Sequence, residues 1–452
     1  MIRLINIGIT LLLFPLLATA QTATVTLQEA VEIALENNYQ LKQAQNNQDL
    51  ADTRVFSAKA DFAPSLNASF NGSRNVGRQF VQEDLSFDDR TTYNLGGSIN
   101  TNLTVFNGFS NIANLRQARA DKASEEQSYN RLRENVIFTT ASRYLQVVLN
   151  EELLKIAESS LEASQSQLEQ VEAQVEVGSR PTVDLFNQEA AVATDELVVI
   201  QRENALEVSK AQLIRIMQDD AITEVQTLVP SIDELSIMPV DLNLQEMIDA
   251  ALNNRSDYKA QEFAIEGNRQ NQTIVRSNLL PSITASAGIN TRYSDQFTLP
   301  GLGEGTVPFT DQFFDQQISR SIGFSVSIPI FNRWNNRTNL QSAQIQLKNS
   351  QLELDNIQFQ ITEEVRQAYN DYKAIVKEME SSLKALIAAE RAFETEQQRY
   401  EIGSTTLIEL NQANANFVQA QSERVQSVYD FIFQEQLLDY YIGQLDQSIR
   451  IN

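Results

Sequence analysis

Two carboxylates occupy equivalent places in a motif that occurs twice in the chain. Asp184 follows the turn Gly178-Ser179-Arg180, and Glu409 follows the turn Gly403-Ser404-Thr405, 225 residues later. A carboxylate in such a position can act as a general acid or base, hold a cation, or cap the start of a helix. The rest of the sequence decides among these three kinds of chemistry.

The residue inventory removes most catalytic chemistry. The 452-residue chain contains no histidine and no cysteine. It therefore lacks the side chains of Ser–His and Cys–His catalysis, and those of imidazole or thiolate metal sites. No pair of acidic residues stands out from the charged helix faces, which disfavours an enzyme that works with paired carboxylates. We expect no catalytic residue, no metal ligand and no cofactor.

The net charge is strongly negative, at −24 from 35 basic and 59 acidic residues. A chain with this charge repels nucleic acid, so we expect no nucleic-acid partner. A channel lined by the charge would favour cations, although solubility is the more ordinary explanation.

Residues 1–20 have the features of a secretory signal peptide. Arg3 supplies the positive start, Ile7–Leu17 is apolar, and small residues precede Gln21. A membrane anchor is the alternative, but the apolar stretch is too short for one. No later apolar run is long enough to cross a bilayer as a helix. We therefore expect an exported protein.

The chain is predicted to consist of two structural repeats, residues 21–218 and 244–442, with a linker at 219–243 and a tail at 443–452. Residues 26–38 match residues 243–255. The segment Phe106–Phe109 matches Phe331–Trp334 at the same offset as the two turns. A long repeat of this kind predicts that both halves have one architecture.

Each repeat is predicted to open with a helix. The capping boxes are Thr26 with Glu29 and Asn243 with Glu246. The helical pattern continues to about Lys59 and about Ser277, and a proline ends it in each repeat. These prolines are Pro64 and Pro281.

Two strand pairs follow, at about 62–107 and about 281–331. Apolar residues alternate there with Ser, Thr, Asn and Gly, which predicts four strands with one apolar and one polar face. The lack of charge on the polar face and a length of ~10 residues favour transmembrane strands over an ordinary half-buried sheet. Polar loops at Asn75–Arg90 and Ser294–Gln317 are expected to be extracellular. Four strands cannot close a membrane barrel, so several chains must share one.

Long helical hairpins complete each repeat, with tips at about 177–182 and 402–406. Gly178 and Gly403 suit the left-handed residue that ends a helix, and Pro181 suits the first position of the next. In the second tip, Thr406 and Glu409 form a predicted capping box. The helix seams hold many small and polar residues at coiled-coil spacing, which favours helices packed side by side around a wet lumen. A solvent-exposed coiled-coil rod remains the alternative.

The order and spacing of these motifs resemble the outer-membrane efflux protein family, the TolC-like channels, over the whole exported chain. The resemblance rests on Leu27-Gln-Glu-Ala30, the proline before each strand pair, Phe106-Asn-Gly108, and the tip sequence Val177–Leu185. It implies a mostly α fold with transmembrane β structure. Three chains would each give four strands to a twelve-stranded outer-membrane β-barrel, and their helices to a trimeric α-barrel.

The function implied is that of an outer-membrane exit duct in a tripartite efflux pump. The duct passively conducts drugs or other small molecules from the periplasm to the outside. Its implied partners are two further copies, a periplasmic adaptor, an inner-membrane transporter and outer-membrane lipid. The alternatives are a channel for type I protein secretion and a structural coiled-coil protein without a pore.

The resemblance also carries residues to two roles. Adaptors of the family contact the hairpin tips, which here are the six turn residues Gly178, Ser179, Arg180, Gly403, Ser404 and Thr405. The gate at the periplasmic entrance links an acid past the first tip to a tyrosine before the second, here Asp184 and Tyr400. Glu409 matches an acidic position of the pore and Arg180 lies beside the gate. Gln412 and Thr405 depart from the family at positions where an acid and a gating arginine can occur.

Overall fold

The computed structural model describes residues 21–81, 86–219, 221–228, 239–298 and 306–445. The predicted signal peptide and the end of the tail lie outside these residues. Contacts divide the chain into two units. The strand unit comprises Gln45–Ser128 and Asp257–Ile357, and the hairpin unit comprises Met1–Ala44, Tyr129–Ser256 and Gln358–Asn452.

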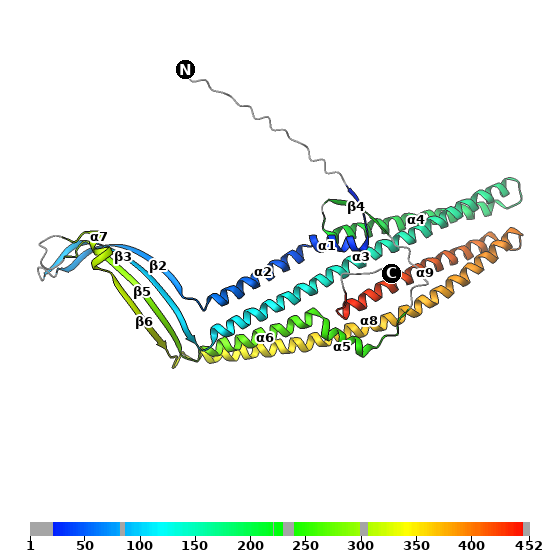
Figure 1. The fold of residues 1–452 in the computed structure, drawn as a ribbon. Coiled ribbons are helices and arrows are strands. Elements are labelled where there is room, and N and C mark those ends of the chain that lie inside the picture. Colours follow the sequence, from blue (N-terminus) through cyan, green and yellow to red (C-terminus); the bar gives the residue numbers. More distant parts are fainter. Residues whose placement is uncertain (1–20, 82–85, 220, 229–238, 299–305, 446–452) are drawn as a thin grey trace, which may run out of the picture. The chain divides into compact units, whose positions relative to one another are not determined.

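The strand unit contains the four predicted strands in one antiparallel sheet (Figure 1). The strands are β2 (Ser65–Val81), β3 (Ser86–Asn107), β5 (Ser282–Ser294) and β6 (Ser319–Ser327). Their order is β2-β3-β5-β6, so the two predicted strand pairs join through β3 and β5. This confirms the prediction of four strands per chain.

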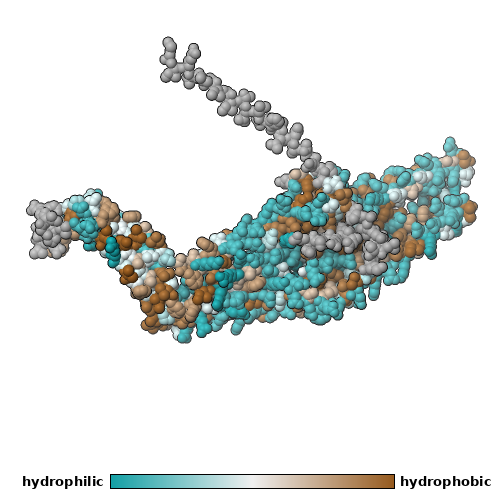
Figure 2. All heavy atoms as spheres, viewed as in Figure 1, coloured by the Kyte–Doolittle hydropathy of each residue, from teal (hydrophilic) through white to brown (hydrophobic). Residues whose placement is uncertain are grey.

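The register gives the sheet two chemically distinct faces. The apolar face carries Leu66, Phe70, Leu95, Ile99, Leu103, Ile283, Ile289, Tyr293, Ile322, Phe324 and Val326. The polar face carries Ser, Thr, Asn and Gly residues, and Ser69 and Ser98 share a hydrogen bond of 2.7 Å across it. Figure 2 shows hydrophobic residues gathered over the strands and mostly hydrophilic ones over the helices of this unit.

The first strand pair is longer than the alternation predicts. Residues 75–81 pair with 86–92, so most of the predicted loop Asn75–Arg90 belongs to β2 and β3. Phe80 and Phe87 meet edge to face with ring centroids 5.3 Å apart. Such cross-strand pairs stabilise a two-stranded ribbon even where charged residues interrupt the alternation. The second predicted loop contains α7 (Phe309–Asp311) and the π-helix η2 (Gln312–Gln316).

Each predicted opening helix is two helices. The elements are α1 (Leu27–Asn37) and α2 (Tyr39–Ala60), and α5 (Leu244–Asn254) and α6 (Ser256–Ser277). The first break is at Asn38, whose side-chain oxygen accepts from the amides of Gln40 and Leu41 and so caps α2. At the second break Arg255 is buried, with its guanidinium 2.5 Å from Glu364. Periodicity misses both breaks because the helical pattern continues through them.

The N-terminal caps also differ between the repeats. Thr26 and Glu29 form the full capping box. The side chain of Asn243 accepts instead from the amide of Gln245, and its own amide donates to Glu246 at 3.2 Å. The second box is therefore incomplete.

The two 67-residue helices of the chain each start from a left-handed turn in the strand unit. Phe109 and Trp334 have φ of 69° and 64°, just before α3 (Ser110–Glu176) and α8 (Asn335–Glu401). Asn111 then donates to the carbonyl of Asp61 at 2.9 Å, and Asn336 donates to the carbonyl of Asn278. These bonds fasten the start of α3 to the end of α2, and that of α8 to the end of α6.

The hairpin unit holds two helical hairpins, α3 with α4 (Thr182–Met217) and α8 with α9 (Leu407–Tyr441) (Figure 1). Its main core lies where α1, α3, α4 and α9 meet around residues such as Ile137, Tyr144 and Leu213. A parallel pair that the sequence did not predict, β1 (Gln21–Val25) with β4 (Ile222–Thr227), closes over this core. No helix among the described residues has the length and apolar character needed to cross a membrane.

Two tyrosines hold the chain on either side of residues 229–238. The Tyr144 hydroxyl donates to the carbonyl of Leu228 at 2.7 Å. The same hydroxyl oxygen lies 3.2 Å from the carbonyl oxygen of Val25. Tyr372 accepts from the amide of Val240 at 2.9 Å. Burial raises the pKa of Tyr144 to about 12.

We expect Tyr144→Phe to reduce the free energy of unfolding by about 0.5–1.5 kcal/mol near neutral pH, because the hydrogen bond from the buried hydroxyl to the backbone is lost. The wild-type protein should also lose stability between pH 10 and about 12, since the unfolded state releases the phenol proton first. The variant should lack this alkaline component. Denaturant unfolding in detergent at several pH values measures both effects. Tyr39→Phe is the control, because Tyr39 is exposed.

Candidate functional site: the hairpin tips

The two tips have the same backbone geometry. Gly178 and Gly403 have φ of 76° and 73°, in the left-handed region predicted for them. In each tip the following serine donates its amide to the residue five positions earlier, Ser179 to Gln174 and Ser404 to Arg399. Each serine hydroxyl donates to that same carbonyl. These are Schellman turns, which satisfy the last carbonyls of α3 and α8.

The helices that leave the tips are capped differently. Pro181 is the N-cap of α4, one position before the predicted one, and makes no side-chain capping bond. Thr406 and Glu409 form the predicted capping box at α9. Hydrogen bonds from the Thr405 hydroxyl and the Thr406 amide hold the pKa of Glu409 below its usual value. Glu409 is therefore a capping carboxylate in this structure.

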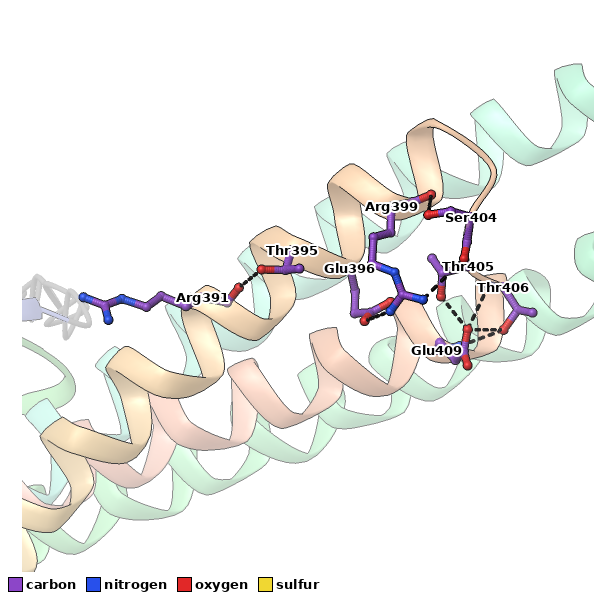
Figure 3. A network of polar contacts seen from close by, with 8 residues as sticks. All are labelled: Arg391, Thr395, Glu396, Arg399, Ser404, Thr405, Thr406 and Glu409. Carbon is purple, nitrogen blue, oxygen red and sulfur yellow. Dashed lines mark hydrogen bonds and ion pairs between the residues drawn. The ribbon is translucent and has the colours of Figure 1, made fainter.

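A polar network continues from this cap to the end of α8 (Figure 3). The Arg399 guanidinium lies 2.5 Å from Glu396 and donates to the carbonyl of Ser404 at 3.4 Å. The Arg399 side chain thus bridges the last turn of α8 and the tip itself. Arg399 was not among the residues predicted from the sequence, although its spacing three residues after Glu396 was the available signal.

The other predicted gate residues, Arg180, Asp184 and Tyr400, contact one another. Arg180 has its guanidinium carbon 4.1 Å from the ring centroid of Tyr400, and its Nη1 lies 3.7 Å from Oδ2 of Asp184. Burial raises the pKa of the Tyr400 phenol. Its hydroxyl lies beside the Gln167 side chain without a well-formed hydrogen bond, and Arg180 joins Asp184 and Tyr400 where we expected a direct polar link.

Buried polar atoms without partners gather at this place. Among the described residues they include Nε2 of Gln167 and Oε1 of Gln174 on α3, and Oε2 of Glu396 and the Tyr400 hydroxyl on α8. A buried polar atom that lacks a hydrogen bond costs about 1–3 kcal/mol. The contact between α3 and α8 near the tips is therefore less stable than its apolar area implies.

Two further contacts hold the hairpins together. Val171, Tyr400, Leu407 and Leu410 form a small apolar core that draws on α3, α8 and α9. The buried Gln188 of α4 accepts from Asn411 of α9 at 3.1 Å and donates to the carbonyl of Ser164 at 3.0 Å. A groove of 590 Å³ then separates α9 from α3 and α4. The hairpins are thus joined at the tips and loosely packed beside them.

The tips expose apolar side chains at equivalent positions. Val177 and Ile402 precede the two glycines and are 78% and 80% exposed. Val183 and Ile408 follow the turns and are also exposed. Sequence reasoning did not select these four, although their common offset of 225 residues was visible. The six predicted turn residues lie among them.

The tips offer no arrangement for bond-making chemistry. In the described part of the chain, no three His, Cys, Asp or Glu side chains are placed to hold a metal ion. Asp184 faces an arginine, and Glu409 faces helix amides and hydroxyls. The arrangement can hold two helical hairpins together and release them.

Comparison with known proteins places this architecture in a family. The sequence model of the outer membrane efflux protein family matches residues 30–217 and again residues 247–444. The outer membrane efflux protein BepC of Brucella suis is 21% identical over 409 residues, covering 90% of this chain and 83% of its own. The outer membrane protein TolC of Escherichia coli is 22% identical over 457 residues, covering 98% and 86%.

Solved structures agree with the fold. The CmeC outer membrane channel of Campylobacter jejuni superimposes with a TM-score of 0.80 at 16% identity, over 94% of this chain and 87% of CmeC. At this identity the likeness establishes the fold. The two matches to the family model cover most of the chain, and they confirm the resemblance found in the sequence. The chain therefore belongs to the outer membrane efflux protein family, and its function is efflux at the outer membrane.

Proposed function

We propose that three copies of this chain form a passive duct from the periplasm across the outer membrane, as the exit part of a tripartite efflux pump. The observation that carries the proposal is the four-stranded sheet. Its apolar face is open to solvent in a single chain, with Leu66, Phe70, Ile322 and Phe324 each at least 74% exposed. Its polar face suits a water-filled lumen.

The apolar band has the height that a membrane barrel needs. Along β5 it extends from Ile283 to Tyr293, and the ten steps between these residues span about 34 Å at ~3.4 Å per residue. A tilt of about 40° reduces this to about 26 Å, close to the apolar band of about 25 Å in outer-membrane barrels. The sheet can thus cross the hydrocarbon region with its polar backbone paired.

The sheet edges supply the argument for several copies. Within the described sheet β2 and β6 each pair on one side. An open edge in lipid leaves backbone groups without partners, so β2 of one copy must pair with β6 of the next. Three copies give the twelve-stranded barrel of the resemblance. The two family-model matches and the shared tip geometry support the accompanying proposal of two internal repeats.

The gate is proposed at the tips, where Arg180 holds Asp184 and Tyr400 together. The unpaired polar atoms between α3 and α8 make the closed arrangement easy to leave. An adaptor that binds the separated hairpins more tightly would shift the population toward the open state. Glu409 keeps the second tip rigid through its cap, and its carboxylate also adds negative charge at the entrance.

The adaptor is proposed to dock on the turn residues and on the exposed apolar side chains beside them. Val177, Ile402, Val183 and Ile408 give each tip an apolar surface flanked by Ser179 and Ser404. Exposed apolar residues that gather in this way are typical of protein interaction sites. The docking surface also explains why a water-exposed turn keeps valine and isoleucine.

We expect the exported protein, extracted from outer membranes in mild detergent, to have three times the chain mass after correction for bound detergent. The chain mass is 50.9 kDa for the full sequence. A dimer would close only eight strands and would contradict the twelve-stranded barrel. A monomer, or a protein that is soluble without detergent, would contradict the membrane span itself.

Arg180→Gln should raise the conductance of the channel in a planar bilayer, because it removes both the charge pair with Asp184 and the contact with the Tyr400 ring. Tyr400→Phe is the matched control and should leave conductance unchanged, since its hydroxyl makes no well-formed hydrogen bond. Wild-type conductance of Arg180→Gln, or a large increase in the conductance of Tyr400→Phe, would contradict the proposed role of Arg180 in the gate.

The double substitution Val177→Ser and Ile402→Ser should weaken binding of the periplasmic adaptor by at least about tenfold. Burial of each such side chain contributes about 1.5–3 kcal/mol, and 1.4 kcal/mol is a factor of ten in affinity. Binding can be measured by titration with purified adaptor. Leu352→Ser, an exposed apolar residue of α8 outside the tips, should bind as the wild type does. Equal affinities for all three proteins would exclude the tips as the docking surface.

A further inference from the structure

The second loop of the strand unit is folded against the apolar face of the sheet. The ideal position for a side chain on Gly97 lies 2.8 Å from the ring of Phe313 and 3.2 Å from that of Phe70. Phe70 belongs to the apolar face, so the Phe313 ring lies on that face too. The hydroxyl of Thr291, which pairs with Gly97, donates to the carbonyl of Phe313 at 2.5 Å. Glycine at position 97 leaves the space that this ring fills.

A buried glutamine fixes the loop in place. Gln312 is fully buried, and its side chain makes three hydrogen bonds to backbone groups. It accepts from the amide of Ser294 at 3.0 Å and donates to the carbonyls of Ser294 at 3.0 Å and Val307 at 2.7 Å. Because its amide oxygen accepts one hydrogen bond and its amide nitrogen donates two, this side chain holds η2 against the end of β5 in one conformation.

The loop turns aromatic rings outward. Phe309 packs edge to face on Tyr293 at 5.3 Å, and stacks on Phe313 at 5.0 Å. Phe314 extends the cluster and is 66% exposed, while Phe309 is 40% exposed. Phe314 contacts only the rings of Phe309 and Phe313 among the described aromatic residues, and most of its own ring stays exposed. We call Phe309, Phe313 and Phe314 the aromatic hook.

We propose that the aromatic hook binds the outer leaflet of the outer membrane and fixes the depth of the barrel there. The proposal rests on the proposed membrane span. Tyr293 ends the apolar band of β5, so the hook lies at the boundary between hydrocarbon and headgroups, where aromatic rings are favoured. The exposed rings are continuous with the apolar face that the span assigns to lipid.

The strand order argues for lipid over a neighbouring copy. The hook packs above β3 and β5, the two central strands, through Gly97 and Thr291. The neighbouring copies must join at the outer strands β2 and β6. The hook therefore lies on the apolar face of the sheet, over the central strands and beside Phe70 of β2, and faces the surroundings of the barrel.

The test places a tryptophan at Phe314 and measures quenching by brominated phospholipids in vesicles. The chain has one tryptophan, Trp334, which is first replaced by Phe. Phe109 holds the equivalent left-handed position in the first strand pair, so this replacement is tolerated by the same turn. Ile322→Trp reports on the sheet face and Val177→Trp on a hairpin tip, and both wild-type side chains are exposed.

In the Phe314→Trp variant, we expect bromine near the lipid headgroups to quench the fluorescence at least as strongly as bromine deep in the acyl chains. Ile322→Trp should lose most with deep bromine, and Val177→Trp should respond to neither. If brominated lipid quenches Ile322→Trp while Phe314→Trp responds only to an aqueous quencher, the proposal for the hook is wrong and the membrane span is supported. If Phe314→Trp is shielded from both quenchers, protein covers it and the lipid assignment is wrong. If brominated lipid quenches neither Ile322→Trp nor Phe314→Trp, both the membrane span and the proposal for the hook are wrong.

Discussion

A peptide group in hydrocarbon has no water to bond, so a sheet placed there cannot keep an open edge. The proposed barrel follows from that constraint. The four strands pair with one another and leave β2 and β6 as edges, which further copies would close in the proposed barrel. On the polar face, small polar side chains bond across the strands, as Ser69 and Ser98 do, and Arg292 is bonded to Gln317.

The hairpin unit would meet a different requirement in the proposed duct, which is reversible contact at the tips. Its core around Tyr144 and Leu213 is apolar and closely packed, as a permanent joint must be. The tips contain one small apolar core, an arginine stacked on a tyrosine, and several buried polar atoms that lack partners. Stability is thus concentrated away from the tips. In the proposed gate, the part of the chain that opens is also the part with the smaller apolar core.

Local features were predictable from sequence because local chemistry determines them. Gly178 and Gly403 were placed correctly, since a left-handed residue strongly favours glycine, and the Thr406–Glu409 cap depends on a spacing of three residues. The strands followed from alternation. The breaks at Asn38 and Arg255 did not, because a cap and a buried ion pair end those helices while the periodicity continues.

The candidate site likewise has features that the sequence could predict and features that it could not. Sequence placed Arg180, Asp184 and Tyr400 near the tips, and the structure brings these three together. It could not show that the arginine stands between the other two, because that depends on side-chain directions within a turn. The bond between Gln188 and Asn411 was equally hidden, since it joins residues 223 positions apart and neither belongs to a motif. Glu409 was selected for the gate and serves here as a cap.

The pairing of β1 with β4 has a consequence for how this chain matures. Gln21 pairs with Ile222, so with the predicted signal peptide at residues 1–20 the first exported segment would wait for a partner that emerges about 200 residues later. Parallel pairing at such separation forms slowly, because the loop must close before any contact rewards it. Until then the edge of β1 and the apolar residues Val25 and Leu27 stay uncovered in the periplasm. A holding chaperone that binds extended apolar segments would find its earliest substrate at this N-terminal strand.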